Sequence, residues 1–500
     1  MTSSGLGEKP PSPRWLMVFY SNMFFGCSGF SIVLPTLWPY LREMKASTEF
    51  LAAVVAAYSV GEGCGGWTSG WLYGRYPDHP KTLLLGGMTL GLLAALFYVL
   101  APLFGTAAPL IVLVARFTSG FDNGTRQTIE QTFISSQIPV EHQTACSSRL
   151  SSCAITGIMM GPALGAPLQA IDWKLPGLTV DGNNGPGLVL VCVCIMNMFV
   201  SFFFFISEPG HRLQTHSETR AAKAQPPNLR GLVVCYMIFF GVNLNMASLE
   251  TITPVLAQRL YGWGPCLNPA ECPFEAEQMY VNLLLSAGGI LSLVMAALMS
   301  FCLGPWIFRH ETTAVTLSHA VSVLVNFGNM DIGGILPSDR FVLDYLLGAF
   351  FGGLARGPGV ALMAQILGPH PKAAYMGLLF AIGAVPRVIG PFLFVELLQL
   401  PEPSQNVDFA YVYQGPVPRT WLLYGCQTAV YVLILLSVQT FRSDLQPHPA
   451  LDGIREPLLR KDGSPVHSDI IPNTPSLVRE GIGSLEDMSR GISARSISLQ

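Results

Sequence analysis

The sequence predicts an all-α membrane protein with twelve transmembrane helices in two similar six-helix halves. Three observations lead to this prediction: the composition, the recurrence of long apolar stretches, and short patterns shared by the two halves of the chain. Half of the 500 residues are hydrophobic, 12% are charged, and the mean hydropathy is +0.44. Soluble domains carry about 25% charged residues, so this chain could not cover the surfaces of several soluble domains.

The apolar stretches approach or exceed the length of about 20 residues that a helix needs to cross a bilayer core. Twelve of them lie at 15–39, 50–72, 82–103, 108–132, 147–169, 187–207, 231–255, 277–303, 313–329, 341–366, 373–399 and 419–440. We therefore expect an N-terminal tail at 1–14, six-helix halves at 15–207 and 231–440, and a linker at 208–230. Residues 441–500 are too polar to bury a core, and we expect a disordered tail there.

The distribution of Lys and Arg predicts the orientation in the membrane. The N-terminal tail and the connections after even-numbered stretches hold eleven basic residues, and the opposite connections hold six. Because cytoplasmic loops carry the excess of basic residues, both termini are expected in the cytoplasm.

Repeated patterns relate the two halves. Gly120 and Gly124 recur 228 residues later as Gly348 and Gly352, and this GxxxG spacing lets helices approach closely. Phe-Phe-Gly occurs in both the first and the seventh stretch, and each copy is followed by a proline expected to interrupt the helix, Pro35 and Pro254. The segment from Gln137 to Gly161-Pro162 likewise matches that from Gln365 to Gly390-Pro391. Two such halves with a site between them form the architecture of major facilitator transporters.

Three motifs resemble those of the major facilitator superfamily. The connection after the second stretch contains Arg75 at the position of a signature arginine, although Gly74 stands where that signature has an acid. The fourth stretch contains Arg116, Gly120 and Gly124 in the spacing R-x-x-x-G-x-x-x-G. The fifth contains Gly161-Pro162 within G-x-x-x-G-P-x-x-G.

Further segments resemble the neuronal ceroid lipofuscinosis branch of that superfamily. They are Gly29–Val33, Trp38–Leu41, Phe50–Gly61, Glu250–Pro254 and Ile366–Pro391. The resemblance covers most of 15–440 but not the tail. It implies an endolysosomal membrane protein that conducts chloride.

Two sequence features concern the lumenal side and the tail. Cys266 and Cys272 lie in a polar connection expected to face the lumen, where oxidising conditions permit a disulfide, although free thiols remain an alternative. Leu458 and Leu459 form a dileucine pair that adaptor proteins could recognise as a sorting signal. Ile454 occupies the place of the usual acidic residue, so an apolar patch in a disordered tail is an equally good interpretation.

Ionisable residues within the stretches mark candidate functional positions, because burying a charge in a bilayer is costly. Asp122, Arg126 and Glu130 are spaced four residues apart, so each can bridge the next as an ion-pair ladder or a gate. Glu130 and Asp344 lie nearer the ends of their stretches, where a side chain reaches the interface at low cost.

Four other charges are candidates for the transport pathway. Arg356 and Arg387 lie near mid-membrane and have no acid within four residues, so each needs an anion or a carboxylate from another helix. Glu62 and Glu250 are candidate proton-coupling groups or partners of these arginines. We expect Arg356 and Arg387 to attract the transported anion, with Arg126 and Glu130 as a gate. The alternative for Arg387 is a structural contact between the eleventh and seventh helices.

Three functions are compatible with the sequence. The first is a chloride-permeable anion pathway, the second a proton-coupled carrier of an organic anion, and the third a receptor or scaffold without transport. No catalytic triad, phosphate loop or metal-ligand spacing is found, so neither an enzyme nor a cofactor or metal is expected. The net charge of −3 and the absence of a basic run exclude a nucleic-acid partner. The expected partners are the bilayer, a small anion or metabolite, and protons.

Overall fold

The computed structural model is helical, with one short hairpin. It describes residues 14–165, 173–175, 178–180, 182–205, 226–261, 263, 276–299, 303, 306–307, 310–331, 336–368, 370–398 and 419–447. From residue 448 onward, the predicted tail lies outside the described residues.

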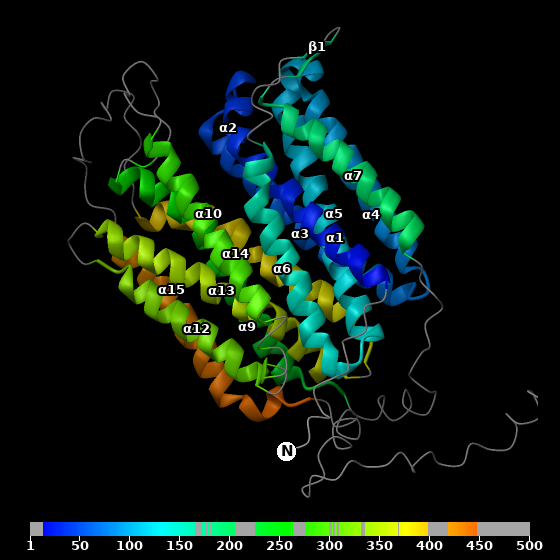
Figure 1. Cartoon of the computed structure of the whole chain (residues 1–500), viewed down its shortest axis with the longest axis vertical. Helices are drawn as coiled ribbons and strands as arrows, with labels where there is room; N and C mark the ends of the chain where they lie inside the picture. The colour runs from blue at the N-terminus through cyan, green and yellow to red at the C-terminus, as the bar shows by residue number, and fades with distance from the viewer. Residues whose placement is uncertain are drawn as a thin grey trace, which may run out of the picture. The chain divides into compact units, whose positions relative to one another are not determined.

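The N-terminal half runs from α1 to α7 (Figure 1). Its helices are α1 (Arg14–Ile32), α2 (Leu34–Glu43), α3 (Thr48–Arg75), α4 (Pro80–Leu100), α5 (Ala108–Gln137), α6 (Val140–Gly165) and α7 (Gly185–Phe204). The 3₁₀ segment η1 (Ala101–Ala107) joins α4 to α5, and Gly105 takes a positive φ of 56° there. Strands β1 (Trp173–Leu175) and β2 (Leu178–Val180) form an antiparallel pair between α6 and α7. The first predicted stretch is divided between α1 and α2, with a proline in the first turn of α2, as the position of Pro35 predicted.

The C-terminal half follows with α9 to α15. Its helices are α9 (Leu229–Tyr261), α10 (Ala276–Ala297), α12 (Glu311–Gly328), α13 (Ser338–Leu367), α14 (Ala373–Leu398) and α15 (Thr420–Thr440), followed by η4 (Arg442–Leu445). The prediction that Pro254 interrupts its helix is wrong, because α9 continues through it to Tyr261. Membrane helices tolerate an internal proline where neighbouring groups satisfy the freed backbone carbonyl.

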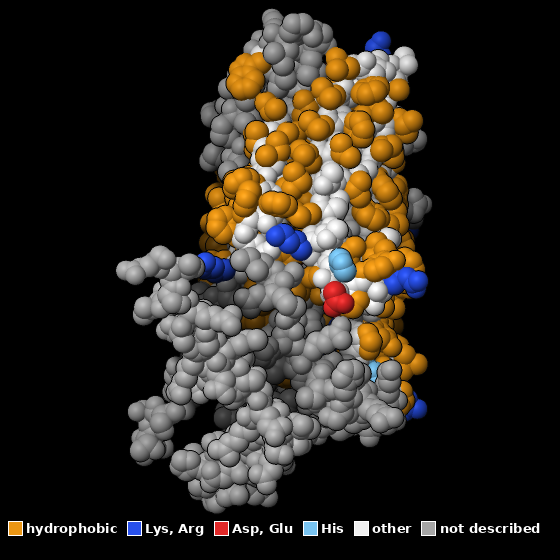
Figure 2. All heavy atoms as spheres, turned by 90° about the vertical axis from the view of Figure 1, so that its right-hand side faces the viewer, with side chains coloured by type: hydrophobic (Ala, Val, Ile, Leu, Met, Phe, Trp, Pro, Cys, Tyr) orange, Lys and Arg blue, Asp and Glu red, His pale blue; other side chains and the backbone are white. Residues whose placement is uncertain are grey.

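An apolar surface covers the helices that face outward. Figure 2 shows one such face, where hydrophobic side chains form a band and basic side chains lie toward its ends. Phe199, Phe203 and Ile195 of α7 are exposed, as is Leu93 of α4. Six described stretches are long and apolar enough to cross a membrane, one of them comprising α4, η1 and α5. The count of twelve crossings stays a prediction.

The two halves meet through small residues at one end of the bundle. A Cβ on Gly70 of α3 would lie 2.6 Å from the carbonyl oxygen of Ala373, and one on Gly377 of α14 would lie 2.5 Å from that of Gly66. At the same end, Glu311 accepts hydrogen bonds from Gln365 of α13 and from Thr144 of α6. These contacts bring the halves together where α3 ends and α14 begins.

Candidate functional site

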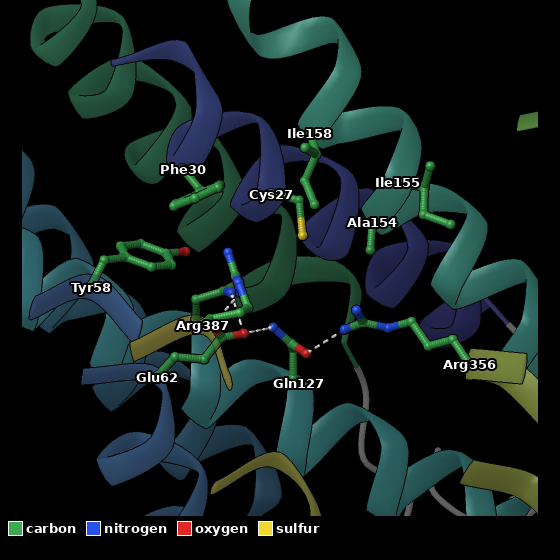
Figure 3. A pocket seen from close by; sticks show the side chains of 11 residues that line it. Cys27, Phe30, Tyr58, Glu62, Gln127, Ala154, Ile155, Ile158, Arg356 and Arg387 are labelled. Atoms are coloured by element: carbon green, nitrogen blue, oxygen red, sulfur yellow. Dashed lines mark hydrogen bonds and ion pairs between the residues drawn. The ribbon is translucent and has the colours of Figure 1, made fainter. Parts of the chain in front are cut away.

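A polar cavity lies between the two halves, and Figure 3 shows the side chains around it. Three predicted pathway residues line it: Glu62 from α3, Arg356 from α13 and Arg387 from α14. The other lining residues are Cys27, Phe30, Tyr58, Asn123, Gln127, Ala154, Ile155 and Ile158. Both halves therefore contribute to one site, as a transport pathway between them requires.

A chain of hydrogen bonds crosses this cavity from one arginine to the other. Arg387 Nη1 lies 2.7 Å from Glu62 Oε2 as an ion pair between α14 and α3. Gln127 Nε2 donates to Glu62 Oε1 at 2.6 Å, and Asn123 Nδ2 donates to the same oxygen at 3.3 Å. Arg356 Nη2 donates to Gln127 Oε1 at 3.0 Å. Gln127 thus joins the acid of one half to an arginine of the other (Figure 3).

The arginines also lie over aromatic rings. The guanidinium carbon of Arg387 is 5.0 Å from the ring centre of Phe30, and that of Arg356 is 5.7 Å from the ring centre of Phe239. Such rings attract a cation through their quadrupole without neutralising it. The charged lining side chains are two guanidiniums and one carboxylate, an excess of one positive charge.

Glycines in α5 fix the position of Glu62. A Cβ on Gly124 would lie less than 3.0 Å from the carbonyl carbon of Glu62, and one on Gly120 would approach Tyr58 equally closely. The backbones of α3 and α5 are therefore in direct contact, which sets Glu62 beside Asn123 and Gln127. The close approach predicted from the GxxxG spacing is confirmed for this pair.

The other described motif residues do not line the cavity. Arg116 is 2% exposed and lies over the rings of Tyr58 and Phe30, 4.7 and 5.4 Å from their centres. Gly161 of α6 packs against α1, where a Cβ would lie 2.8 Å from the backbone nitrogen of Ile32. Gly390 is buried in α14, whereas Arg75 is exposed at the end of α3. The side chains of Pro162 and Pro391 lie outside the described residues.

The predicted ladder on α5 forms only its first step. Arg126 Nη2 pairs with Asp122 Oδ2 at 2.8 Å. Among the described residues Arg126 makes no ion pair with Glu130, whose Oε1 instead accepts from Asn22 of α1 at 3.1 Å. Arg126 donates to the carbonyl oxygen of Asn22, so the group faces α1 within one half and does not line the central cavity. The expectation of a continuous ladder is wrong, because partners on another helix compete with the four-residue spacing.

Several predicted positions lie outside the described residues: the side chain of Glu250, Cys266, Cys272, Leu458 and Leu459. Conversely, sequence reasoning missed Asn123 and Gln127, which join the charged residues of the cavity. The sequence contained a pattern that could have identified them, since they are four residues apart and therefore lie on one face of the helix. Gln127 also precedes Arg356 by 229 residues, close to the spacing of the repeat.

Two helical halves with a polar cavity between them define a membrane transport protein. The Major Facilitator Superfamily model matches residues 19–391, and the chain belongs to that family. Major facilitator superfamily domain-containing protein 8 of Xenopus laevis is 22% identical over 451 residues, which is 78% of this chain and 87% of that protein.

Solved transporters share the fold. The human organic anion transporter MFSD10 (TETRAN) superposes with a TM-score of 0.59 at 14% identity, covering 86% of this chain and all of that one. The proton:xylose symporter XylE superposes with a TM-score of 0.64 at 12% identity, covering 88% of this chain and 98% of that one. These similarities establish the fold, whereas the solute must be inferred from the residues of the cavity.

Proposed function

We propose that the chain moves small anions, with chloride as the leading solute, through the central cavity in an endolysosomal membrane. The observation that carries the proposal is the charge of the lining, where two guanidiniums face one carboxylate. A guanidinium keeps its charge in any protein environment. Because charges interact strongly at low dielectric, an excess of one positive charge attracts an anion.

The two arginines have different roles in this proposal. Arg387 is held by Glu62 across the halves, so this pair closes the cavity and opens when the halves move apart. Arg356 lines the cavity and donates to the amide oxygen of Gln127, and in this proposal the anion passes beside its guanidinium. The structural alternative for Arg387 now concerns α3 rather than α9, because its ion-pair partner is on α3.

The similar proteins are compatible with this choice of solute. One structure with the same fold is that of an organic anion transporter, and the related Xenopus laevis protein belongs to the branch that the sequence resembles. A proton-coupled carrier of an organic anion is the second candidate, favoured by the Glu62 carboxylate within the cavity. A scaffold without transport is less compatible with a polar cavity to which both halves contribute charged side chains.

Flux through reconstituted protein tests the proposal. Liposomes that contain the purified full-length chain are loaded with chloride. They should release the chloride when a proton leak is supplied, whereas liposomes loaded with gluconate should release little gluconate. Arg356→Gln should reduce the chloride flux at least tenfold, the effect expected when about 1.4 kcal/mol of attraction is lost. Arg419→Gln is the matched control, since Arg419 is exposed outside the cavity.

Two outcomes would contradict parts of the proposal. Unchanged chloride flux in Arg356→Gln and in Arg387→Gln, with normal abundance, would exclude the cavity as the anion pathway. Flux of an organic anion that requires a pH gradient, without chloride flux, would favour the second candidate. The compartment is tested separately by co-localising the tagged chain with endolysosomal markers, with and without Leu458→Ala and Leu459→Ala.

A further inference from the structure

A second polar cavity lies inside the C-terminal half, enclosed by α9, α12, α13 and α15. It shares no lining residue with the central cavity. The volume of this cavity is about 20 Å³, and by the same measure one water needs about 10–15 Å³. The cavity therefore has room for one water or one small ion. Eight lining residues carry polar side-chain groups: Asn245, Ser248, Thr253, Asn326, Asn329, Asp344, Tyr345 and Tyr424.

Two oxygens in this cavity lack hydrogen-bond partners among the described residues. Asp344 is 8% exposed, and its Oδ2 is buried without a partner. Asn329 is 5% exposed, and its Oδ1 is likewise without a partner. A buried carboxylate oxygen and a buried amide oxygen without donors are costly, so a group that satisfies both would be bound favourably.

Two other asparagines of the lining direct their amide nitrogens at backbone carbonyl oxygens. Asn326 donates its amide nitrogen to the carbonyl oxygen of Ser322 at 2.7 Å, which leaves its oxygen as the free acceptor. Asn245 similarly donates its nitrogen to Gly348 at 3.3 Å. The cavity therefore offers several acceptors around one carboxylate.

The end of α12 makes this region more negative. α12 ends at Gly328, where a Cβ would lie 2.5 Å from Asp344 Oδ2, so the carboxylate lies against the C-terminus of the helix. A helix C-terminus carries a partial charge of about −0.5, which favours cations. Arg340, four residues before Asp344, donates to the carbonyl oxygen of Met330 at 3.2 Å and makes no ion pair with Asp344 in the described part of the chain.

We propose that this cavity is a binding site for one monovalent cation of the size of Na⁺, with Asp344 as its charged ligand and Asn329 and Asn326 as neutral oxygen ligands. Hard cations prefer oxygen ligands, but Ca²⁺ takes about six to eight of them and Mg²⁺ usually keeps several waters, for which this cavity has no room. One carboxylate matches one positive charge. The site is independent of the anion pathway proposed above, because the two cavities have separate linings.

The repeat supports this assignment. Asp344 follows Arg116 by 228 residues, the same spacing that separates Gly120 from Gly348. The first half thus carries its own buried cation, Arg116, where the second half carries a carboxylate. A bound cation would supply in the second half the positive charge that Arg116 supplies in the first.

Binding of Na⁺ to the purified full-length chain tests the site. Thermal unfolding is followed in NaCl, KCl and choline chloride at equal chloride and ionic strength, so that an effect of chloride on the central cavity cancels. We expect a saturable rise of the unfolding temperature with Na⁺ and binding of about one radioactive Na⁺ per chain. Asp344→Asn should lower the Na⁺ affinity at least tenfold, and Asn329→Ala should lower it while keeping the charge.

Asp339→Asn is the matched control, because Asp339 is an exposed carboxylate in the first turn of the same helix and should bind Na⁺ like wild type. If Asp344→Asn fails to fold, the Na⁺ affinity of Asn329→Ala decides the test instead. Equal unfolding temperatures in the three chloride salts would overturn the proposal. So would a stabilisation that follows pH but not Na⁺, since a proton on Asp344 would then satisfy the carboxylate. Neither result would bear on anion flux through the central cavity.

Discussion

The contact between α3 and α5 makes a quantitative prediction for Gly120→Ala. The new Cβ would lie 2.8 Å from the carbonyl carbon of Tyr58 and closer still to its oxygen. Both are backbone atoms, so no side chain can rotate away and the helices must separate. Overpacking of this kind costs about 1–3 kcal/mol. Replacing glycine by alanine within a helix stabilises the helix by about 1 kcal/mol, so the net loss of stability is up to about 2 kcal/mol.

A second glycine isolates the packing contribution. A Cβ added to Gly86 of α4 would have no heavy atom within 4 Å, so Gly86→Ala gains the helix propensity without the clash. The difference between the two variants should therefore be about 1–3 kcal/mol, the cost of overpacking alone. Unfolding in mixed micelles titrated with a denaturing detergent measures both free energies. If Gly120→Ala proves as stable as Gly86→Ala, α3 and α5 do not meet as described.

Further predictions concern the ends of the bundle and the buried charges. Gly377→Leu should hold α3 and α14 apart, because its side chain would meet the backbone of Gly66, and cysteine-accessibility labelling at that end should increase. Arg126→Ala should destabilise the chain by about 3–5 kcal/mol, because it leaves the buried Asp122 unpaired. Substitution of the exposed Arg75 should cost less than about 0.5 kcal/mol, and unfolding in a denaturing detergent measures both free energies. Burial lowers the pKa of Lys372 to about 8, below its ordinary value, so stability should rise between pH 8 and the unfolded-state pKa, and Lys372→Met should remove this rise in thermal unfolding. Protease added to sealed organelles should remove 441–500, and a protected tail would contradict the predicted orientation.

The fold was largely predictable because it follows from local properties of the chain. The apolar stretches follow from the local order of residues, and the GxxxG spacing of Gly120 and Gly124 predicted a close helix approach, although it did not say which helix is the partner. Pro254 was predicted to interrupt a helix because a proline removes a hydrogen bond. The surrounding helices override this local effect, and α9 runs through it.

The pairing of charges was less predictable. Glu62 and Arg387 were each identified as costly charges, but they are 325 residues apart, and no periodicity relates them. Asp344 was assigned to the end of its helix, where exposure is inexpensive, yet the end of α12 covers it. Glu130 was expected to pair along its own helix, and Asn22 from another helix takes that place. In each case the decisive neighbour came from a distant segment.

Reversing the charge of Arg356 tests the central claim most directly. Arg356→Glu changes the charge of the cavity lining from an excess of one positive charge to an excess of one negative charge while keeping a side chain that can accept from Gln127. Chloride flux and Na⁺ flux are measured on the same liposomes with matched protein abundance. If the charge of the cavity selects the solute, chloride flux should fall by at least tenfold in Arg356→Glu, and the ratio of chloride flux to Na⁺ flux should fall with it. An unchanged ratio with undiminished chloride flux would show that anions do not pass this arginine.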